Sequence, residues 1–98
     1  MKTIDKNLKQ KLVRLVKAIV PDAKIYLFGS YATGNATELS DIDLAIESNT
    51  KLSRFDIYEI KSIIEASNII EDIDIVDLDQ VDLNFKKSIL EKAVLWTD

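Results

Sequence analysis

Two β-forming segments joined through a glycine-bearing turn constrain the fold of this chain more than any other feature of its sequence. Ile25–Phe28 is a short run of apolar and aromatic residues, which predicts a buried strand that ends at Gly29. In Leu39–Glu47 apolar and polar residues alternate, which predicts a second strand with one face in the core. The sequence therefore predicts a strand, a tight turn and another strand within residues 25–47.

The turn after the first strand has the composition of an anion-binding turn. Gly29 lets the backbone turn sharply and lets a ligand come close, because it has no Cβ. Ser30 begins a segment, Ser30–Ala32, that we expect to form the first turn of a helix. Free N–H groups at a helix start attract anions, and a serine hydroxyl adds one more donor. Gly29 and Ser30 are therefore candidate phosphate-binding residues.

The second strand carries two carboxylates on one face. Alternation places Asp41 and Asp43 together, opposite three core residues, which are Ile42, Leu44 and Ile46. Cα atoms two residues apart in a strand are separated by about 6.5–7 Å, which suits two carboxylates that converge on one Mg²⁺ or bridge two metal ions. Residues 25–50 contain no Lys or Arg, so no local cation neutralises this pair.

The alternative is that Asp41 and Asp43 simply occupy the solvated face of an amphipathic strand, as polar residues commonly do. The combination with Gly29 and Ser30, which ten residues separate from Asp41, argues against that alternative. The whole pattern instead indicates a site for metal-dependent phosphoryl or nucleotidyl transfer.

Such a site usually needs a third carboxylate on an adjacent strand, and a later acidic segment offers candidates. Ile73 and Ile75 would face the core, so Asp72 and Asp74 would face away from it. Asp77 falls on the core side, where a charge is costly, and is expected to mark the end of the strand. We select Asp74 because it lies mid-strand, with Asp72 and Asp77 as alternatives. A plain amphipathic strand in an acidic stretch is the competing explanation.

The segment Leu27–Ile46 closely resembles the active-site signature of the nucleotidyltransferase superfamily related to DNA polymerase β. The length and layout of the chain resemble the minimal nucleotidyltransferase (MNT) branch, whose members are often encoded beside HEPN-domain proteins as toxin–antitoxin pairs. The resemblance implies that the glycine–serine turn holds the β and γ phosphates of ATP or another NTP. It also implies that Asp41 and Asp43 bind Mg²⁺, in a site that could hold two ions, and Asp74 matches the third aspartate of the family. Thr33 stands where many relatives carry Arg, and this departure bears on activity rather than on fold.

The resemblance further implies a Mg²⁺-dependent nucleotidyltransferase that moves a nucleoside monophosphate, AMP from ATP, onto a hydroxyl of a partner protein. Larger relatives that modify antibiotics or RNA carry an additional domain for the acceptor. The acceptor of this chain is therefore expected on a partner in a hetero-oligomer, such as a tyrosine of a HEPN-domain toxin. In the alternative function, favoured by Thr33, the chain is a non-catalytic antitoxin or binding module with a vestigial site that neutralises its partner by occlusion.

The rest of the chain is expected to form scaffold. Helices are expected over Asp5–Val20, Ser53–Asn68 and Asp82–Lys92, and a last apolar strand over Ala93–Trp96. The buried side of the middle helix would be formed by Phe55, Ile57, Ile60, Ile63 and Ile64. We expect an α+β fold in one domain, residues 1–98, with a small mixed β-sheet, helices packed on one face and the acidic face left open.

Composition and charge exclude several function classes. The absence of Cys and His excludes thiol nucleophiles, histidine bases and the usual zinc ligands, so any metal should be a hard, oxygen-bound ion. The sequence has no 18-residue apolar run and no signal-peptide layout, so we expect a soluble cytoplasmic protein without membrane contact. Residues 1–24 carry a charge of +5 and the remainder −9. The basic first helix could dock RNA or an acidic partner, but a solvated surface is the preferred explanation, and the acidic whole argues against direct nucleic-acid binding.

Overall fold

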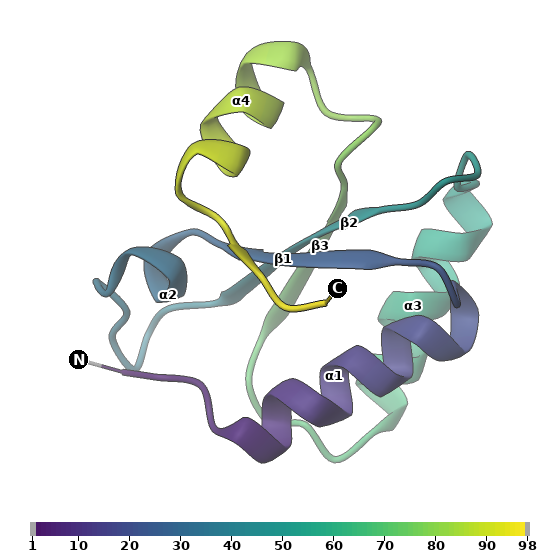
Figure 1. Cartoon of the computed structure of the whole chain (residues 1–98). Coiled ribbons are helices and arrows are strands. Elements are labelled where there is room, and N and C mark those ends of the chain that lie inside the picture. The colour runs from purple at the N-terminus through teal and green to yellow at the C-terminus, as the bar shows by residue number, and fades with distance from the viewer. Residues whose placement is uncertain (1, 98) are drawn as a thin grey trace.

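A four-stranded mixed β-sheet organises the fold, with the strand order β3-β2-β1-β4 (Figure 1). The computed structural model describes residues 2–97. β2 (Ile42–Glu47) pairs antiparallel with β1 (Lys24–Phe28) and parallel with β3 (Ile73–Asp77). The short edge strand β4 (Val94–Leu95) pairs antiparallel with β1. The predicted small mixed sheet is therefore confirmed.

Helices α1 (Lys6–Ile19) and α3 (Arg54–Ala66) lie against each other and cover one face of this sheet (Figure 1). Both begin next to the residue at which the sequence predicts their start, because Asp5 and Ser53 accept hydrogen bonds from the first-turn amides. Between them and the sheet lies the main core. Its fully buried members include Leu12, Val16, Ile25, Ile42, Leu44, Ile46 and Ile60. The apolar face predicted for β2 is thus the face that points into the core.

Helix α4 (Leu83–Lys92) lies on the opposite face of the sheet, which the sequence analysis expected to be open. Ala45 of β2 is fully buried there in a second apolar cluster with Leu78 and Ile89. Phe28 and Phe85 meet edge to face, with their ring centroids 6.3 Å apart. Helices α1 and α3 lie on one face of the sheet as expected, but the position of α4 on the other face was not predicted. The acidic face is therefore open only where α4 does not cover it.

Two further local expectations are corrected. β2 begins at Ile42 rather than at Leu39, whose side chain is 94% exposed. Residues 37–40 form a turn instead, in which the Thr37 amide donates to Ser40 Oγ at 2.9 Å. Phe55 is 64% exposed and does not join the buried side of α3. It is the second residue of that helix.

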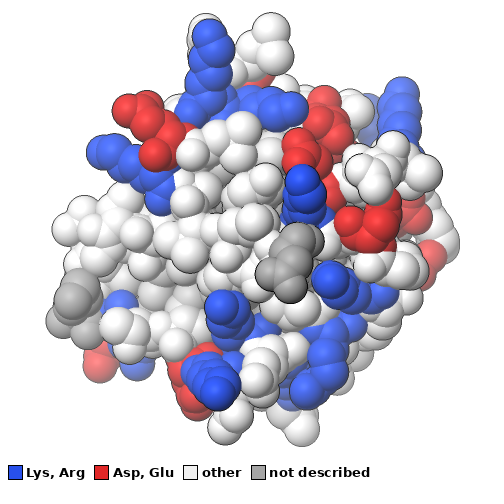
Figure 2. All heavy atoms as spheres, viewed as in Figure 1, with Lys and Arg blue, Asp and Glu red and all other residues white. Residues whose placement is uncertain are grey.

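Basic side chains gather over α1 at the bottom of Figure 2, as the charge distribution of the sequence predicts. One of them, Lys9, is not simply solvated, because its Nζ lies 5.7 Å from the ring centroid of Trp96. Trp96 itself packs against the main core. This agrees with a packing role for the tryptophan rather than a base-stacking role.

Replacing Ser53 with Ala should destabilise the fold through α3. Ser53 Oγ accepts from the Asp56 amide at 3.1 Å, and Asp56 Oδ2 accepts from the Ser53 amide at 2.8 Å. Loss of such a cap costs about 1 kcal/mol, or roughly 4–8 °C in melting temperature for a domain of this size. Thermal denaturation is the measurement. Ser88→Ala, at an exposed position within α4, is the control, and equal losses in the two variants would contradict the capping role.

Candidate active site

Gly29 forms the turn between β1 and the short helix α2 (Ser30–Thr33). Its φ of 74° and ψ of −156° lie in a region that is open to glycine and strained for other residues. A Cβ at this position would also overlap the Asp43 carboxylate, with Asp43 Cγ only 3.1 Å away and Oδ2 closer still. Glycine is therefore required here for two independent reasons, and its missing side chain makes room for the Asp43 carboxylate.

Helix α2 presents unpaired amides next to this turn. The amides of Ala32 and Thr33 donate to the Gly29 carbonyl at 3.1 and 3.3 Å. Ser30 and Tyr31 come first in the helix, where amides have no intrahelical acceptor. The predicted helical turn after Gly29 is confirmed, and Ser30 adds a half-buried hydroxyl to these donors.

Thr33 contributes no charge to the site and instead holds the turn together. Its hydroxyl lies 3.4 Å from the carbonyl oxygens of both Gly29 and Ser30, to which it donates. It also accepts from Asn35 Nδ2 at 3.1 Å. Thr33, which stands in place of the common arginine, therefore makes its hydrogen bonds within its own loop.

The sheet register brings Asp43 and Asp74 together. Asp43 pairs with Phe28 on one side and with Asp74 on the other, so the two carboxylates start from directly opposed positions on adjacent strands. Asp41 lies one residue before β2 and is exposed. The register thus places Asp43 between the glycine turn and Asp74.

Neither of the two alternatives to Asp74 lies opposite Asp43 in the register, although Asp72 lines the same cavity as Asp41 and Asp74. Asp72 precedes β3, where its carbonyl accepts from the Ile42 amide at 2.9 Å and its side chain is exposed. Asp77 pairs with Ile46 at the far end of β3, as expected for a residue that ends the strand. Three residues of strand span about 10 Å, so Asp77 is well removed from Asp74. Of the three candidates, Asp74 is the one opposite Asp43.

The ionisation of Asp43 reflects its position between the glycine turn and Asp74. Partial burial, followed by the charges of Asp74 and Asp41, raises the pKa of the Asp43 carboxyl from 3.8 to about 6. Carboxylates in this arrangement repel one another unless a cation lies between them. The oxygen donors of Asp41, Asp43 and Asp74 fit Mg²⁺, whose preferred ligands they are. Within residues 2–97 no three acidic side chains lie close enough together to form a metal site. Asp43 and Asp74 are already paired, so Asp41 would have to approach them to complete one.

Two cations that the sequence analysis missed lie beside these residues. Lys61 of α3 lines a cavity of about 540 Å³ together with Asp41 and Asp74. Lys92 of α4 lines another, of about 330 Å³, with Gly29 and Thr33. No local pattern marks either lysine, because each comes from a helix remote in sequence from the glycine turn.

The pKa of Asp43 predicts how the stability of the metal-free protein depends on pH. Because the folded-state pKa is raised above that of the unfolded chain, the native state binds more protons between pH 4 and about 6. Stability should therefore be greatest at the acidic end of this window and fall as pH rises through about 6. Melting temperatures measured from pH 4 to 8 in EDTA check this. Asp43→Asn should flatten the profile, and an unchanged profile in that variant would assign the dependence to another group.

A glycine turn that holds one aspartate against a second, on a strand–turn–strand unit, defines a site of the nucleotidyltransferase class. The chain belongs to the nucleotidyltransferase family of DNA polymerase β, because the family model described as "Polymerase beta, Nucleotidyltransferase" matches residues 6–98. This agrees with the resemblance of Leu27–Ile46 to the signature of that superfamily.

One curated protein and one solved structure are similar to most of this chain. The protein adenylyltransferase MntA of Shewanella oneidensis is 35% identical over 71 residues, which are 71% of this chain and 50% of MntA. The chain thus spans half the length of this curated relative. A chain in the crystal structure of a toxin–antitoxin pair with AMP-PNP matches with a TM-score of 0.77 at 26% identity, over 91% of this chain and 72% of that chain.

A second solved structure supports the fold. It is a complex of a tri-AMPylated Shewanella oneidensis HEPN toxin with an MNT antitoxin. Its matching chain has a TM-score of 0.70 at 24% identity, over 91% of this chain and 68% of that chain.

Among residues 2–97 no helix is both long and apolar enough to cross a membrane.

Proposed function

We propose that this chain is a Mg²⁺-dependent nucleotidyltransferase that moves AMP from ATP onto a hydroxyl of a partner protein. The observation that carries the proposal is the position of the Asp43 carboxylate, which fits against the bare Cα of Gly29 and lies opposite Asp74 in the register. Family membership gives the reaction class, and the similarity to an adenylyltransferase and to a chain crystallised with AMP-PNP favours ATP as the donor.

Each site residue has a distinct part in this proposal. The amides after Gly29 and the Ser30 hydroxyl would hold the β and γ phosphates, since donors at a helix start favour anions. Asp41 and Asp43 would hold Mg²⁺, with Asp74 as a third ligand or as the base that accepts the proton of the attacking hydroxyl. A bound Mg²⁺ would supply neutralising charge while the partner's hydroxyl bonds to the α-phosphorus of ATP and pyrophosphate leaves.

The acceptor is proposed to lie on a HEPN-domain partner that acts as a toxin, with this chain as the antitoxin. The match to one chain of a toxin–antitoxin pair supports a partner of this type. The carboxylates lie on the part of the sheet that α4 leaves uncovered, so a segment of another molecule could reach Asp74. Such a pair would work in the cytoplasm, where ATP is available.

A second function is favoured by Thr33, which puts no cation beside the phosphate-binding turn. In that case the chain neutralises its partner by occlusion and keeps a vestigial site. Lys92, which lines a cavity with Thr33 and Gly29, is a cation that could compensate in the catalytic alternative.

Label transfer separates the two functions. The chain is incubated with the product of the neighbouring gene, Mg²⁺ and ATP labelled at the α-phosphate. We expect the label on the partner protein, and none when EDTA replaces Mg²⁺. Absence of transfer, with toxicity still suppressed by Asp41→Asn/Asp43→Asn, would sink the catalytic proposal and leave occlusion.

A further inference from the structure

A large cavity lies away from the candidate active site. It measures about 680 Å³ and is lined by the loop before α3, the first two turns of that helix, and the end of β3. Its wall includes Asp77, about 10 Å along the strand from Asp74. Asp77 also faces the side of the sheet opposite to that of Asp74, because the two residues are three positions apart in the strand. A ligand in this cavity would therefore occupy a different place from one held by Gly29 and Asp43.

Positively charged side chains are concentrated in this cavity, although residues 25–98 are acidic as a whole. Residues 25–98 contain six Lys or Arg and fifteen Asp or Glu. Three of those six cations line the cavity, with a single carboxylate among them: Lys51, Arg54, Lys61 and Asp77. Within residues 2–97 no carboxylate lies within 4.0 Å of the charged groups of these three cations. Three cations against one carboxylate leave an excess of positive charge in the lining of this cavity.

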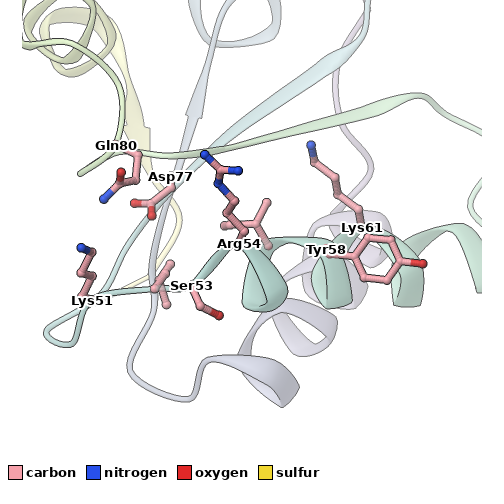
Figure 3. Close-up of a pocket in the computed structure, with 9 residues that line it drawn as sticks. Lys51, Ser53, Arg54, Tyr58, Lys61, Asp77 and Gln80 are labelled. Atoms are coloured by element: carbon pink, nitrogen blue, oxygen red, sulfur yellow. The ribbon is translucent and has the colours of Figure 1, made fainter.

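The geometry of α3 aligns these groups. Arg54, Tyr58 and Lys61 are spaced i, i+4 and i+7, so they form one stripe along the helix. Figure 3 shows Arg54 and Lys61 extending from α3 toward β3, with Asp77 and Gln80 across from them. Arg54 and Lys61 are about 10 Å apart along the helix axis, farther than a single phosphate group extends. The spacing suits a ligand with several anionic groups.

The cavity also offers an apolar and aromatic surface. Leu52 and Ile57 contribute side chains to its wall. Tyr58 is 66% exposed, although an aromatic ring of this size is usually more buried. An exposed ring beside unpaired cations is the combination that binds a stacked base and its phosphates.

We propose that this cavity is a second ligand site, which binds a phosphate-bearing polyanion of the nucleotide class, either a free nucleoside polyphosphate or a short single-stranded oligonucleotide. Arg54 and Lys51 hold phosphate oxygens through charge-assisted hydrogen bonds, and Tyr58 stacks on a base. The site does not depend on the proposed transfer reaction, because none of its groups belongs to the glycine turn or the Asp43–Asp74 pair.

Binding to the full-length chain in EDTA tests the proposal, since removal of divalent ions disfavours nucleotide binding at the candidate active site. The probes are ATP, inorganic tripolyphosphate, a fluorescein-labelled single-stranded oligonucleotide and a poly-glutamate peptide. Amide chemical shifts should move within residues 51–61 and 77–80, and affinity should fall as salt rises. Tighter binding of the oligonucleotide would identify a strand as the ligand, and tighter binding of ATP a free nucleotide. Binding of the peptide alone, or of no probe, would overturn the proposal.

Variants localise the site. Lys51→Gln/Arg54→Gln should weaken ATP or oligonucleotide binding by about tenfold or more, the usual loss for a charge-assisted hydrogen bond. Lys6→Gln/Lys17→Gln is the control, because it removes the same charge from exposed positions of α1. Equal losses in both would mean nonspecific attraction and would refute the site. Lys61 is left unchanged, since it also borders the cavity of Asp74.

Tyr58→Ala then tests the class of ligand. It should weaken ATP and the oligonucleotide but leave tripolyphosphate binding unchanged, because only the first two have a base to stack. Tyr58 is exposed, so the variant should fold, and a circular dichroism spectrum verifies this. If ATP binds the variant as tightly as the native chain, the cavity does not recognise a nucleotide.

Discussion

Asp43→Asn should reduce label transfer to the partner by at least about 10³-fold, a loss of the size seen when a charged group that stabilises phosphoryl transfer is removed. The same substitution should raise the melting temperature of the metal-free protein at pH 7.5. The melting temperature should rise because burial and the charge of Asp74 disfavour the ionised form of Asp43, whose pKa is raised to about 6. A neutral amide at this position no longer repels Asp74.

Opposite changes in activity and stability are the feature that identifies a functional carboxylate. Glu91→Gln removes the same charge from an exposed position of α4 and should change neither quantity. Transfer rates with the partner and thermal denaturation in EDTA provide the two measurements. If Asp43→Asn keeps native transfer, the candidate site is not the catalytic one, and if it also lowers the melting temperature, its carboxylate has a structural role instead.

Gly29→Ala should both abolish transfer and destabilise the fold by about 2–4 kcal/mol. About 1–3 kcal/mol comes from placing a side chain in a backbone conformation that only glycine adopts readily. The remainder comes from overlap of the new Cβ with the Asp43 carboxylate. Denaturant unfolding gives the free energy, and the transfer assay gives the activity.

Gly34 supplies a matched control for this substitution. It also has a positive φ, of 79°, but it lies in the αL region and outside the contact between Gly29 and Asp43. Gly34→Ala should therefore introduce backbone strain without overlap with the Asp43 carboxylate, and keep most of the transfer activity.

A double-mutant cycle separates the two contributions at Gly29. In an Asp43→Ala background the overlap disappears, so Gly29→Ala should cost less there than in the native chain. Equal costs in the two backgrounds would show that the close approach of Gly29 to Asp43 is not what makes the glycine necessary.

Much of the scaffold could be predicted because its signals are local. Ser53 and Asp82 mark the starts of α3 and α4, since a cap depends only on amides two or three residues away. The start of β2 was misplaced at Leu39 because the competing turn depends on a hydrogen bond between Thr37 and Ser40. Helical spacing alone places Phe55 on the buried side of α3, but spacing does not reveal which part of a helix is covered, and Phe55 is exposed.

By itself the sequence determined the strand–turn–strand unit, the glycine at its turn and the face of β2 on which Asp43 lies, because strand alternation and glycine conformation act over a few residues. Only the tertiary structure decided that Asp74, rather than Asp72 or Asp77, lies opposite Asp43, because register is fixed by the pairing of two strands whose first residues are 31 positions apart. It likewise decided that α4 covers part of the acidic face and that Lys51 and Arg54 border one cavity with Asp77. These contacts join segments remote in sequence, and no local pattern specifies them.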